Sequence, residues 1–263
     1  MKAKKILWRV SKALLVAAFW FGVWALISFR INSEFLLPSP SSVFEALCML
    51  AVTPEFWMTT AHSLLRVVGG ILCSLVIGSL LAVLTEGSRG INSLLSPALG
   101  VIKATPVASF IILALLWIDR NTLPIFIISL IVIPIVWSNV SVGIRSVDKD
   151  LVEVTKVYGF TPLQKISRLY IPSVTPYFMA ACRSSLGMAW KAGISAEVLS
   201  TPENAIGTEL YFSKTYLETP SLFAWTLVII LMSIIIEKLF VYGLERLGSK
   251  MHIIPKGEQN DKT

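Results

Sequence analysis

Charged side chains that interrupt the long apolar stretches of this sequence include Arg66, Lys103, Arg183, Lys191 and Glu197. Charge within a membrane usually faces the interior of a helix bundle or a water-filled cavity. Arg183 and Lys191 are eight residues apart, so on one helix they differ by about 80° and can border one polar strip. Glu197 projects in a very different direction. These residues either line a substrate path that attracts anions or form interhelical salt bridges, and Arg66 and Arg183 can also extend to a membrane interface.

The sequence shows no arrangement typical of catalysis, nucleotide binding or a metal centre. It contains no G-x-x-x-x-G-K-[ST] motif and no Ser/His/Asp or paired-carboxylate arrangement. The cysteines and histidines are isolated from one another: Cys48, Cys73, Cys182, His62 and His252. We therefore expect no catalytic residue, no metal site and no cofactor in this chain. Driving energy must come from a partner or from an ion gradient.

The composition places these residues in a membrane protein. The chain has 263 residues, of which 55% are hydrophobic and only 15% are charged, with a mean hydropathy of +0.73. A soluble domain is about a quarter charged. A net charge of +7 in a soluble protein would suggest nucleic acid as a partner. In a membrane protein basic residues set the topology instead, so we expect contact with lipid and none with nucleic acid.

Six apolar stretches are long enough, or nearly so, to span a membrane as helices, since a span needs about 20 residues. They are residues 13–29, 65–84, 94–117, 123–144, 175–199 and 222–244, of which 175–199 is the most polar. Pro97 and Pro106 interrupt the third stretch and Pro134 lies in the fourth, which favours packed or cavity-lining helices there. The first stretch is interpreted as an uncleaved span rather than a signal peptide.

Lysine and arginine are unevenly distributed between the connecting segments. They are concentrated in the tail 1–12, the loop 148–172 and the region after the sixth stretch, which includes the tail 249–263. The opposite side has only Arg30, Arg120 and Lys214. By the positive-inside rule both termini and the loop 148–172 are cytoplasmic. On the other side, the capping-box spacing of Ser42 and Glu45 predicts a short interfacial helix that ends near Leu50.

Small residues recur every four positions in two of the predicted spans. The stripes are Gly70, Ser74, Gly78 and Ala82 in the second span, and Ala181, Ser185, Ala189 and Gly193 in the fifth. Such a stripe allows two helix backbones to approach closely. It indicates either tight helix packing or a pathway lined by small side chains.

The predicted cytoplasmic loop carries a spaced pattern of residues: Glu153, Gly159, Leu169, Ile171 and Pro172. The pattern resembles the E-A-A-x3-G-x9-I-x-L-P loop of permease subunits of bacterial ABC importers. Val154 and Thr155 stand where alanines are usual, and the aliphatic identities of Leu169 and Ile171 are exchanged. A second interpretation of the loop is an amphipathic helix resting on lipid headgroups, which fits the lysines but does not explain the spacing.

The resemblance covers most of the chain and is greatest to the sulfonate/nitrate/taurine branch of the family. It rests on Leu37–Phe44, His62–Arg66, Arg183–Trp190 and Ala196–Glu197. Two segments depart from that branch. Ala205-Ile-Gly207 stands where Gly-Leu-Gly is common, and Lys103–Ala108 differs from the commoner Ile-Pro form.

The resemblance implies an all-α membrane protein with about six transmembrane helices and the MetI-like permease fold, with residues 13–248 as the permease domain. It implies a homodimer in the bacterial inner membrane, two ABC ATPase subunits that bind ATP and Mg²⁺, and an extracytoplasmic solute-binding protein. The solute would be small and polar or anionic, similar to sulfonate, nitrate, taurine or a thiamine precursor. The side chains that couple to the ATPase would be Glu153, Val157, Tyr158, Gly159, Phe160, Leu169, Ile171 and Pro172.

Local chemistry fits a compact projection at this loop. Gly159 can adopt positive φ where the chain turns, and Pro162 suits the first turn of a following helix. Two other functions are open. An ion-gradient-driven secondary transporter would need more spans or an internal repeat, with intramembrane acidic relays. A multi-span membrane enzyme is disfavoured because no catalytic constellation is present.

Overall fold

The chain is helical throughout the part that the structure describes. The computed structural model describes residues 2–250, and every regular element within that range is a helix. The helices are α1 (Lys2–Ile31), α2 (Pro40–Val52), α3 (Pro54–Gly87), α4 (Arg89–Ala104), α5 (Val107–Ala114), α6 (Leu123–Arg145), α7 (Lys149–Val157), α8 (Pro162–Lys165), the π-helix η1 (Ile166–Tyr170), α9 (Ile171–Ser200), α10 (Ile206–Thr215) and α11 (Thr219–Lys250). The predicted all-α class is confirmed, while the tail 251–263 lies outside the described residues.

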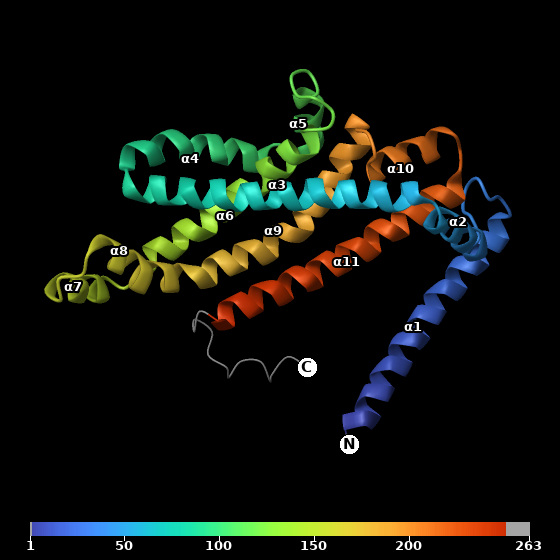
Figure 1. Ribbon diagram of the computed structural model, residues 1–263. Helices are drawn as coiled ribbons and strands as arrows, with labels where there is room; N and C mark the ends of the chain where they lie inside the picture. Colours follow the sequence, from blue (N-terminus) through green and yellow to red (C-terminus); the bar gives the residue numbers. More distant parts are fainter. Residues whose placement is uncertain (1, 251–263) are drawn as a thin grey trace.

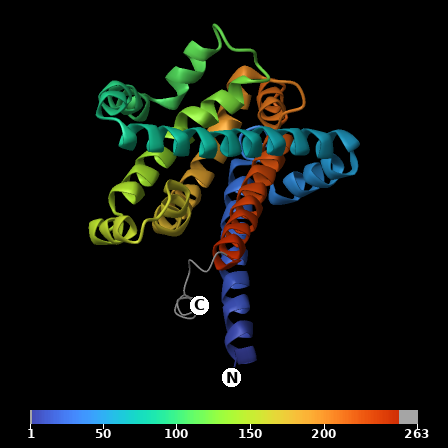
Figure 2. The same cartoon turned by 60° about the vertical axis from the view of Figure 1, so that its left-hand side comes forward.

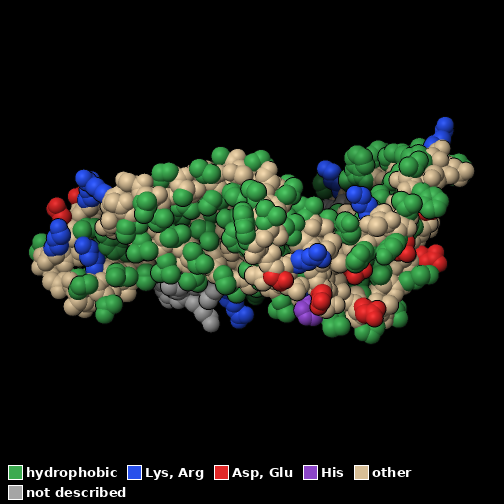
Figure 3. All heavy atoms as spheres, turned by 90° about the horizontal axis from the view of Figure 1, so that it is seen from above, with side chains coloured by type: hydrophobic (Ala, Val, Ile, Leu, Met, Phe, Trp, Pro, Cys, Tyr) green, Lys and Arg blue, Asp and Glu red, His purple; other side chains and the backbone are tan. Residues whose placement is uncertain are grey.

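Four helices in residues 2–250 are long and apolar enough to cross a membrane. These segments are Leu14–Ile31, Pro54–Gly87, Leu123–Arg145 and Thr219–Gly243. α9 has 30 residues but is not among them, in keeping with the polar character predicted for 175–199. Charged side chains gather over the α7/α8 end and the α2/α10 end of the face shown in Figure 3, and a largely uncharged band lies between them. The distribution is that of a multi-pass membrane protein.

The predicted third span is not one continuous helix. α4 and α5 meet at a bend of 105°. Pro106 lacks an N–H group and disfavours helical geometry at the preceding residue, so Thr105 is extended with φ −83° and ψ 134°. The stretch 94–117 is therefore divided between two helices and a turn, although its hydropathy alone suggested a single span.

The start of α2 also differs from the expected one. The N-cap is Ser39, whose Oγ accepts the backbone N–H of Ser42 at 3.1 Å, and Pro40 occupies the first helical position. The cap predicted at Ser42 is wrong by three residues because Pro40 can start a helix. Thr53 then ends α2 and caps α3, which begins at Pro54 rather than near residue 65.

The centre of the molecule is the packing of α3, α6 and α9, which lie against one another in Figures 1 and 2. Gly70 and Gly78 of α3 face Ile128 and Val136 of α6 so closely that a Cβ atom would lie about 3 Å from them. Gly193 of α9 packs in the same way against Ile128. Close helix packing therefore accounts for both small-residue stripes.

α1 stands apart from this centre and contacts the body near its C-terminal end (Figures 1 and 2). There Trp24 Nε1 donates to the Pro38 carbonyl at 3.1 Å, and its ring stacks on Phe223 with centroids 6.0 Å apart. Ser28 Oγ donates to the Leu37 carbonyl at 3.0 Å. The rest of α1 exposes large apolar side chains, as a helix bordered by lipid does.

Candidate functional site

The loop 148–172 folds into two short helices joined by a tight left-handed turn. α7 begins at the N-cap Asp148, and Gly159, with φ +64°, follows its end. The Phe160 N–H donates to the Thr155 carbonyl at 2.9 Å, and the Gly159 N–H donates to the Lys156 carbonyl at 3.1 Å. This pair of bonds is the Schellman motif, which satisfies the last carbonyls of α7. The positive φ expected of Gly159 is confirmed.

The second arm begins directly after this turn. Thr161 Oγ1 accepts the Gln164 N–H, and the Gln164 side chain accepts the Thr161 N–H at 2.9 Å, which together form a capping box. Pro162 occupies the first turn of α8, as predicted. α8 continues through η1 into α9, so helical backbone runs from Pro162 to Ser200. The second arm of the loop is therefore continuous with α9.

The loop exposes apolar side chains at its tip. Val157, Tyr158 and Leu163 are 85%, 75% and 78% exposed. Leaving such side chains in water forgoes about 1.5–3 kcal/mol each, so their exposure indicates a contact surface for a partner. Leu163 and Ile166 were missed from sequence, although they stand one and four residues after Pro162 on the α8–η1 helix.

The other predicted coupling residues are less uniform in exposure. Glu153 is exposed, Ile171 is 43% exposed, and Phe160 and Pro172 are half-buried. Leu169 is 8% exposed and packs inward, so it positions the loop rather than presenting a surface. The expectation that Phe160 inserts into a partner applies at most to the part of its ring that remains accessible.

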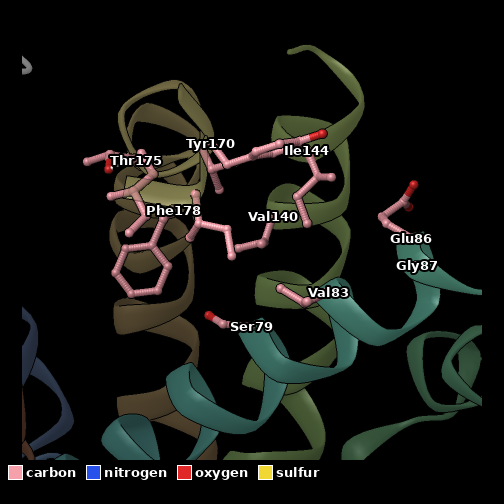
Figure 4. A pocket seen from close by; sticks show the side chains of 12 residues that line it. Ser79, Val83, Glu86, Gly87, Val140, Ile144, Tyr170, Thr175 and Phe178 are labelled. Atoms are coloured by element: carbon pink, nitrogen blue, oxygen red, sulfur yellow. Dashed lines mark hydrogen bonds between the residues drawn. The ribbon is translucent and has the colours of Figure 1, made fainter. Parts of the chain in front are cut away.

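An apolar pocket of about 580 Å³ lies between this loop and the helix bundle (Figure 4). It is lined by Ser79, Val83, Glu86 and Gly87 of α3, Val140 and Ile144 of α6, Ile166 and Tyr170 of η1, and Ile171, Val174, Thr175 and Phe178 of α9. At its rim Glu86 pairs with Arg145 at 3.5 Å. The pocket lies between α3 and the first turns of α9, while Tyr177 of α9 packs against Gly143 of α6.

Glu197, predicted for the substrate path, lies in a buried cluster near the opposite end of α9. Its side chain is 0% exposed. Its Oε2 accepts from Ser63 Oγ at 2.8 Å and from the Gly207 N–H at 3.2 Å, while Oε1 lies 3.5 Å from Arg66 Nη1. Ser63 Oγ also accepts the Ile206 N–H at 2.9 Å. The structure therefore places Glu197 in the interhelical salt-bridge alternative.

The same cluster holds the segment between α9 and α10. Arg66 donates to the carbonyls of Asn204 at 3.1 Å and Glu203 at 2.6 Å. A Cβ atom on Gly207 would overlap Glu197 and the backbone of Val198. The sequence signals near this contact were Arg66, Glu197, the glycine in Ala205-Ile-Gly207 and the segment His62–Arg66, but none of them indicated that Ser63 bonds to Glu197.

Apart from Arg66, the predicted basic residues do not lie beside Glu197. Lys191 and Arg183 are exposed on α9, and Lys103 is exposed near the end of α4. Lys103 Nζ lies 5.4 Å from the centre of the Trp137 ring on α6, within the range of a cation–π contact. Whether these three side chains line a path stays a prediction.

Comparison with protein families gives one extended match. Residues 74–247 match the family described as "Binding-protein-dependent transport system inner membrane component". The matched region includes α6, the loop 148–172, α9 and α10. It therefore covers most of the core and all of the candidate coupling surface.

Individual proteins resemble the chain over most of its length. It is 27% identical over 237 residues to the putative aliphatic sulfonates transport permease protein SsuC of Bacillus subtilis (strain 168), covering 89% of this chain and 85% of that protein. It is 29% identical over 188 residues to the nitrate import permease protein NrtB of Synechococcus elongatus, covering 67% of each. Among solved structures, a chain of a bacterial alginate ABC transporter in complex with an alginate pentasaccharide-bound periplasmic protein superposes with a TM-score of 0.60 at 16% identity, covering 95% of this chain and 97% of that one. The last likeness confirms the predicted permease fold.

Proposed function

The chain belongs to the family of binding-protein-dependent transport system inner membrane components, and we propose that it is the permease subunit of an ATP-driven ABC importer. In this proposal it forms the membrane path for a small nutrient and couples that path to a separate ATPase. Members of this family that resemble it are permeases for sulfonates and nitrate, and such subunits are not enzymes themselves. ATP and Mg²⁺ would be bound by the partner subunits.

The observation that carries the proposal is the tip of the loop 148–172. Gly159 and Pro162 fix the angle between α7 and α8, and Val157, Tyr158 and Leu163 expose apolar surface on both sides of that angle. Basic side chains in the same loop, such as Lys156 and Arg168, are also exposed. A groove on an ATPase fits this combination better than a lipid surface does, because the apolar side chains surround a rigid turn rather than form one helix face.

Charge distribution supports the orientation in which this loop and both termini are cytoplasmic. The α7/α8 end, the N-terminal segment and the C-terminal segment together carry most of the lysine and arginine, and Arg120 and Lys214 are among the few at the α2/α10 end. That end would face the extracytoplasmic binding protein. The family's description, which names dependence on a binding protein, supports this partner.

The arrangement of α9 suggests how coupling would work. Closure of two ATPase subunits on ATP would displace α7 and α8, and the helical backbone from Pro162 to Ser200 would transmit the displacement to the membrane helices. The opposite end of α9 is held to α3 and α10 by the Glu197 cluster. The movement would therefore be a tilt of α9 rather than a translation.

The test is the co-purification of the ATPase subunit with full-length variants. Gly159→Asp places a side chain at φ +64° and should cost about 1 kcal/mol or more in backbone strain, so the turn should open and ATPase binding should fall by tenfold or more. Gly90→Asp is the matched control, since it introduces the same side chain into open space at the start of α4, where acidic residues are favoured.

The two variants separate coupling from a general effect of the new charge. Both should insert into the membrane at the level of the unmodified chain, and only Gly159→Asp should lose the ATPase. Stoichiometric ATPase binding and normal solute-stimulated hydrolysis in Gly159→Asp would refute the coupling role of the loop. The ion-gradient-driven alternative predicts that no ATPase co-purifies with either variant or with the unmodified chain.

A further inference from the structure

The exposed face of α9 differs chemically from those of the other membrane helices. From Ala180 onward it consists of Ala180, Arg183, Ser184, Met188, Lys191, Ser195 and Leu199, with Gly187 half-exposed between them. On α3 the exposed positions are large and aliphatic, among them Leu72, Val76, Leu80 and Val83. α11 likewise exposes Ile230, Leu231, Ile234 and Ile235. The aliphatic faces of α3 and α11 are compatible with contact to lipid hydrocarbon. The small, hydroxylated and charged side chains on the exposed face of α9 are not.

Lys191 lies deep within the span, as its neighbours show. Gly193 packs against Ile128, which is five residues inside the start of α6, and Gly143 of α6 packs against Tyr177, so the two helices run antiparallel. Gly193 is level with Ile128, and Lys191 is two residues further inward. Lys191 is therefore level with a point about 10 Å from the start of α6, which is about 34 Å long. A hydrocarbon core is about 30 Å thick, so the lysine stem starts inside it.

The charge of Lys191 has no counter-charge on the same surface. No ion pair of Lys191 is found among the side chains that the structure describes. The acidic residue of α9, Glu197, is fully buried on the other side of the helix with Arg66 and Ser63. An uncompensated ammonium at this depth requires water or an anion beside it.

We propose that the exposed face of α9 lines the translocation path and that Lys191 binds the negatively charged group of the transported solute. The proposal rests on the permease function proposed above. A second copy of this chain would screen the face from lipid and present its own Lys191 to the same path. An ammonium group is a compact positive charge with three hydrogen-bond donors, and it does not require a planar partner as a guanidinium does. The solute class is therefore a small organic or inorganic oxyanion rather than a sugar or a cation.

The residues around Lys191 leave room for such a solute. Gly187 and Ser195 lie one turn below and one turn above it on the same face, and a Cβ atom on Gly187 would meet nothing within 4 Å. The Ser195 hydroxyl donates to the Lys191 carbonyl at 2.8 Å, so the Lys191 ammonium rather than this hydroxyl is the donor offered to an anion on this face. Lys191 would supply the electrostatic attraction and this face the space.

Charged thiol reagents test the proposal without knowledge of the natural solute. Cys48, Cys73 and Cys182 are replaced by alanine in the full-length chain, and Ser195→Cys is introduced. Membrane vesicles containing the chain and its ATPase are treated with 2-sulfonatoethyl methanethiosulfonate, an anion, and with the 2-(trimethylammonium)ethyl reagent, a cation. Leu80→Cys is the control, because Leu80 is 58% exposed on an aliphatic face of α3, about 10 Å from the C-terminal end of that helix.

The proposal predicts that Ser195→Cys reacts with the anionic reagent in preference to the cationic one, while Leu80→Cys reacts with neither. Lys191→Met should lower the anion-to-cation rate ratio about tenfold, equivalent to about 1.4 kcal/mol, and Lys191→Arg should retain it. The proposal is overturned if Ser195→Cys is as unreactive as Leu80→Cys, or if Lys191→Met leaves the ratio unchanged. ATPase co-purification from the same vesicles tests the proposed permease function separately. Neither labelling result for Ser195→Cys bears on that function.

Discussion

Ser63→Ala is the sharpest test of the cluster that fixes the far end of α9. Ser63 Oγ donates to Glu197 Oε2 at 2.8 Å and accepts the buried Ile206 N–H at 2.9 Å. Alanine removes both bonds without changing the shape of the backbone. The carboxylate keeps Gly207 and Arg66, but the Ile206 N–H is left without an acceptor.

The expected loss follows from these bonds. An unsatisfied buried group costs about 1–3 kcal/mol, and a hydrogen bond to a charged group contributes about 1.5–3 kcal/mol, so Ser63→Ala should destabilise the protein by about 3–5 kcal/mol. For a chain of this size about 1 kcal/mol corresponds to about 2–4 °C in Tm, so a fall of about 10 °C is expected. Ser74→Ala is the matched control, since Ser74 is equally buried on α3.

The control should change Tm by only about 2 °C. Ser74 Oγ donates to the Gly70 carbonyl and contacts Ser129 Oγ, which has its own bond to the Ile125 carbonyl. No buried group is left unpaired by its loss. The assay is thermal unfolding of the detergent-solubilised full-length protein, with limited proteolysis between α9 and α10 as a local readout. Equal Tm values for the two variants, with no new cleavage, would refute the assignment of the cluster as a structural lock.

Two further outcomes are expected. Burial, and to a lesser extent the charge of Glu55, raises the pKa of Glu209 on α10. The folded protein therefore binds this proton more tightly than the unfolded chain does. The stability that protonated Glu209 contributes to the folded protein is lost as the pH rises through the raised pKa. Glu209→Gln should therefore raise Tm at pH 7 and leave it unchanged at pH 4, measured by thermal unfolding, and an equal shift at both values would contradict the assignment. In intact cells, an impermeant thiol reagent should label Lys214→Cys and not Lys165→Cys in a cysteine-free chain, because Lys214 lies on α10 and Lys165 on the coupling loop; the reverse pattern would invert the topology.

The loop was predictable in detail because its geometry is local. Gly159 requires positive φ, Pro162 starts a helix, and Thr161 with Gln164 closes a capping box, all within a few residues of one another. The same locality explains the bend at Pro106. The Thr105-Pro106 dipeptide is enough to predict that Thr105 is extended. A hydropathy average over the stretch 94–117 does not detect this local effect, so the stretch suggested one span where α4 and α5 meet at 105°.

The partners of Glu197 were not predictable, because they are set by helix packing. Ser63 is 134 residues from Glu197 in the chain, and the segment His62–Arg66 resembles the family without indicating which residue Ser63 contacts. The angular argument separated Glu197 correctly from the direction of Lys191. It could not say which helix lay on that side, since this depends on the close approach of α3, α6 and α9 at Gly70, Gly78 and Gly193.

The two ends of α9 differ in a way that bears on the proposed import cycle. At the α10 end, Gly193 and Gly207 pack so closely on neighbouring atoms that no space remains for displacement, and Glu197 binds three other residues there. At the loop end, the pocket of about 580 Å³ lies between α3 and the first turns of α9, while Tyr177 of α9 packs on Gly143 of α6. Tilting the loop end of α9 would shift the packing of Tyr177 on Gly143, whereas moving its other end would break hydrogen bonds to a buried carboxylate. In the proposed importer, α9 would thus pivot near Gly193, and its greatest movement would occur where the loop meets the ATPase.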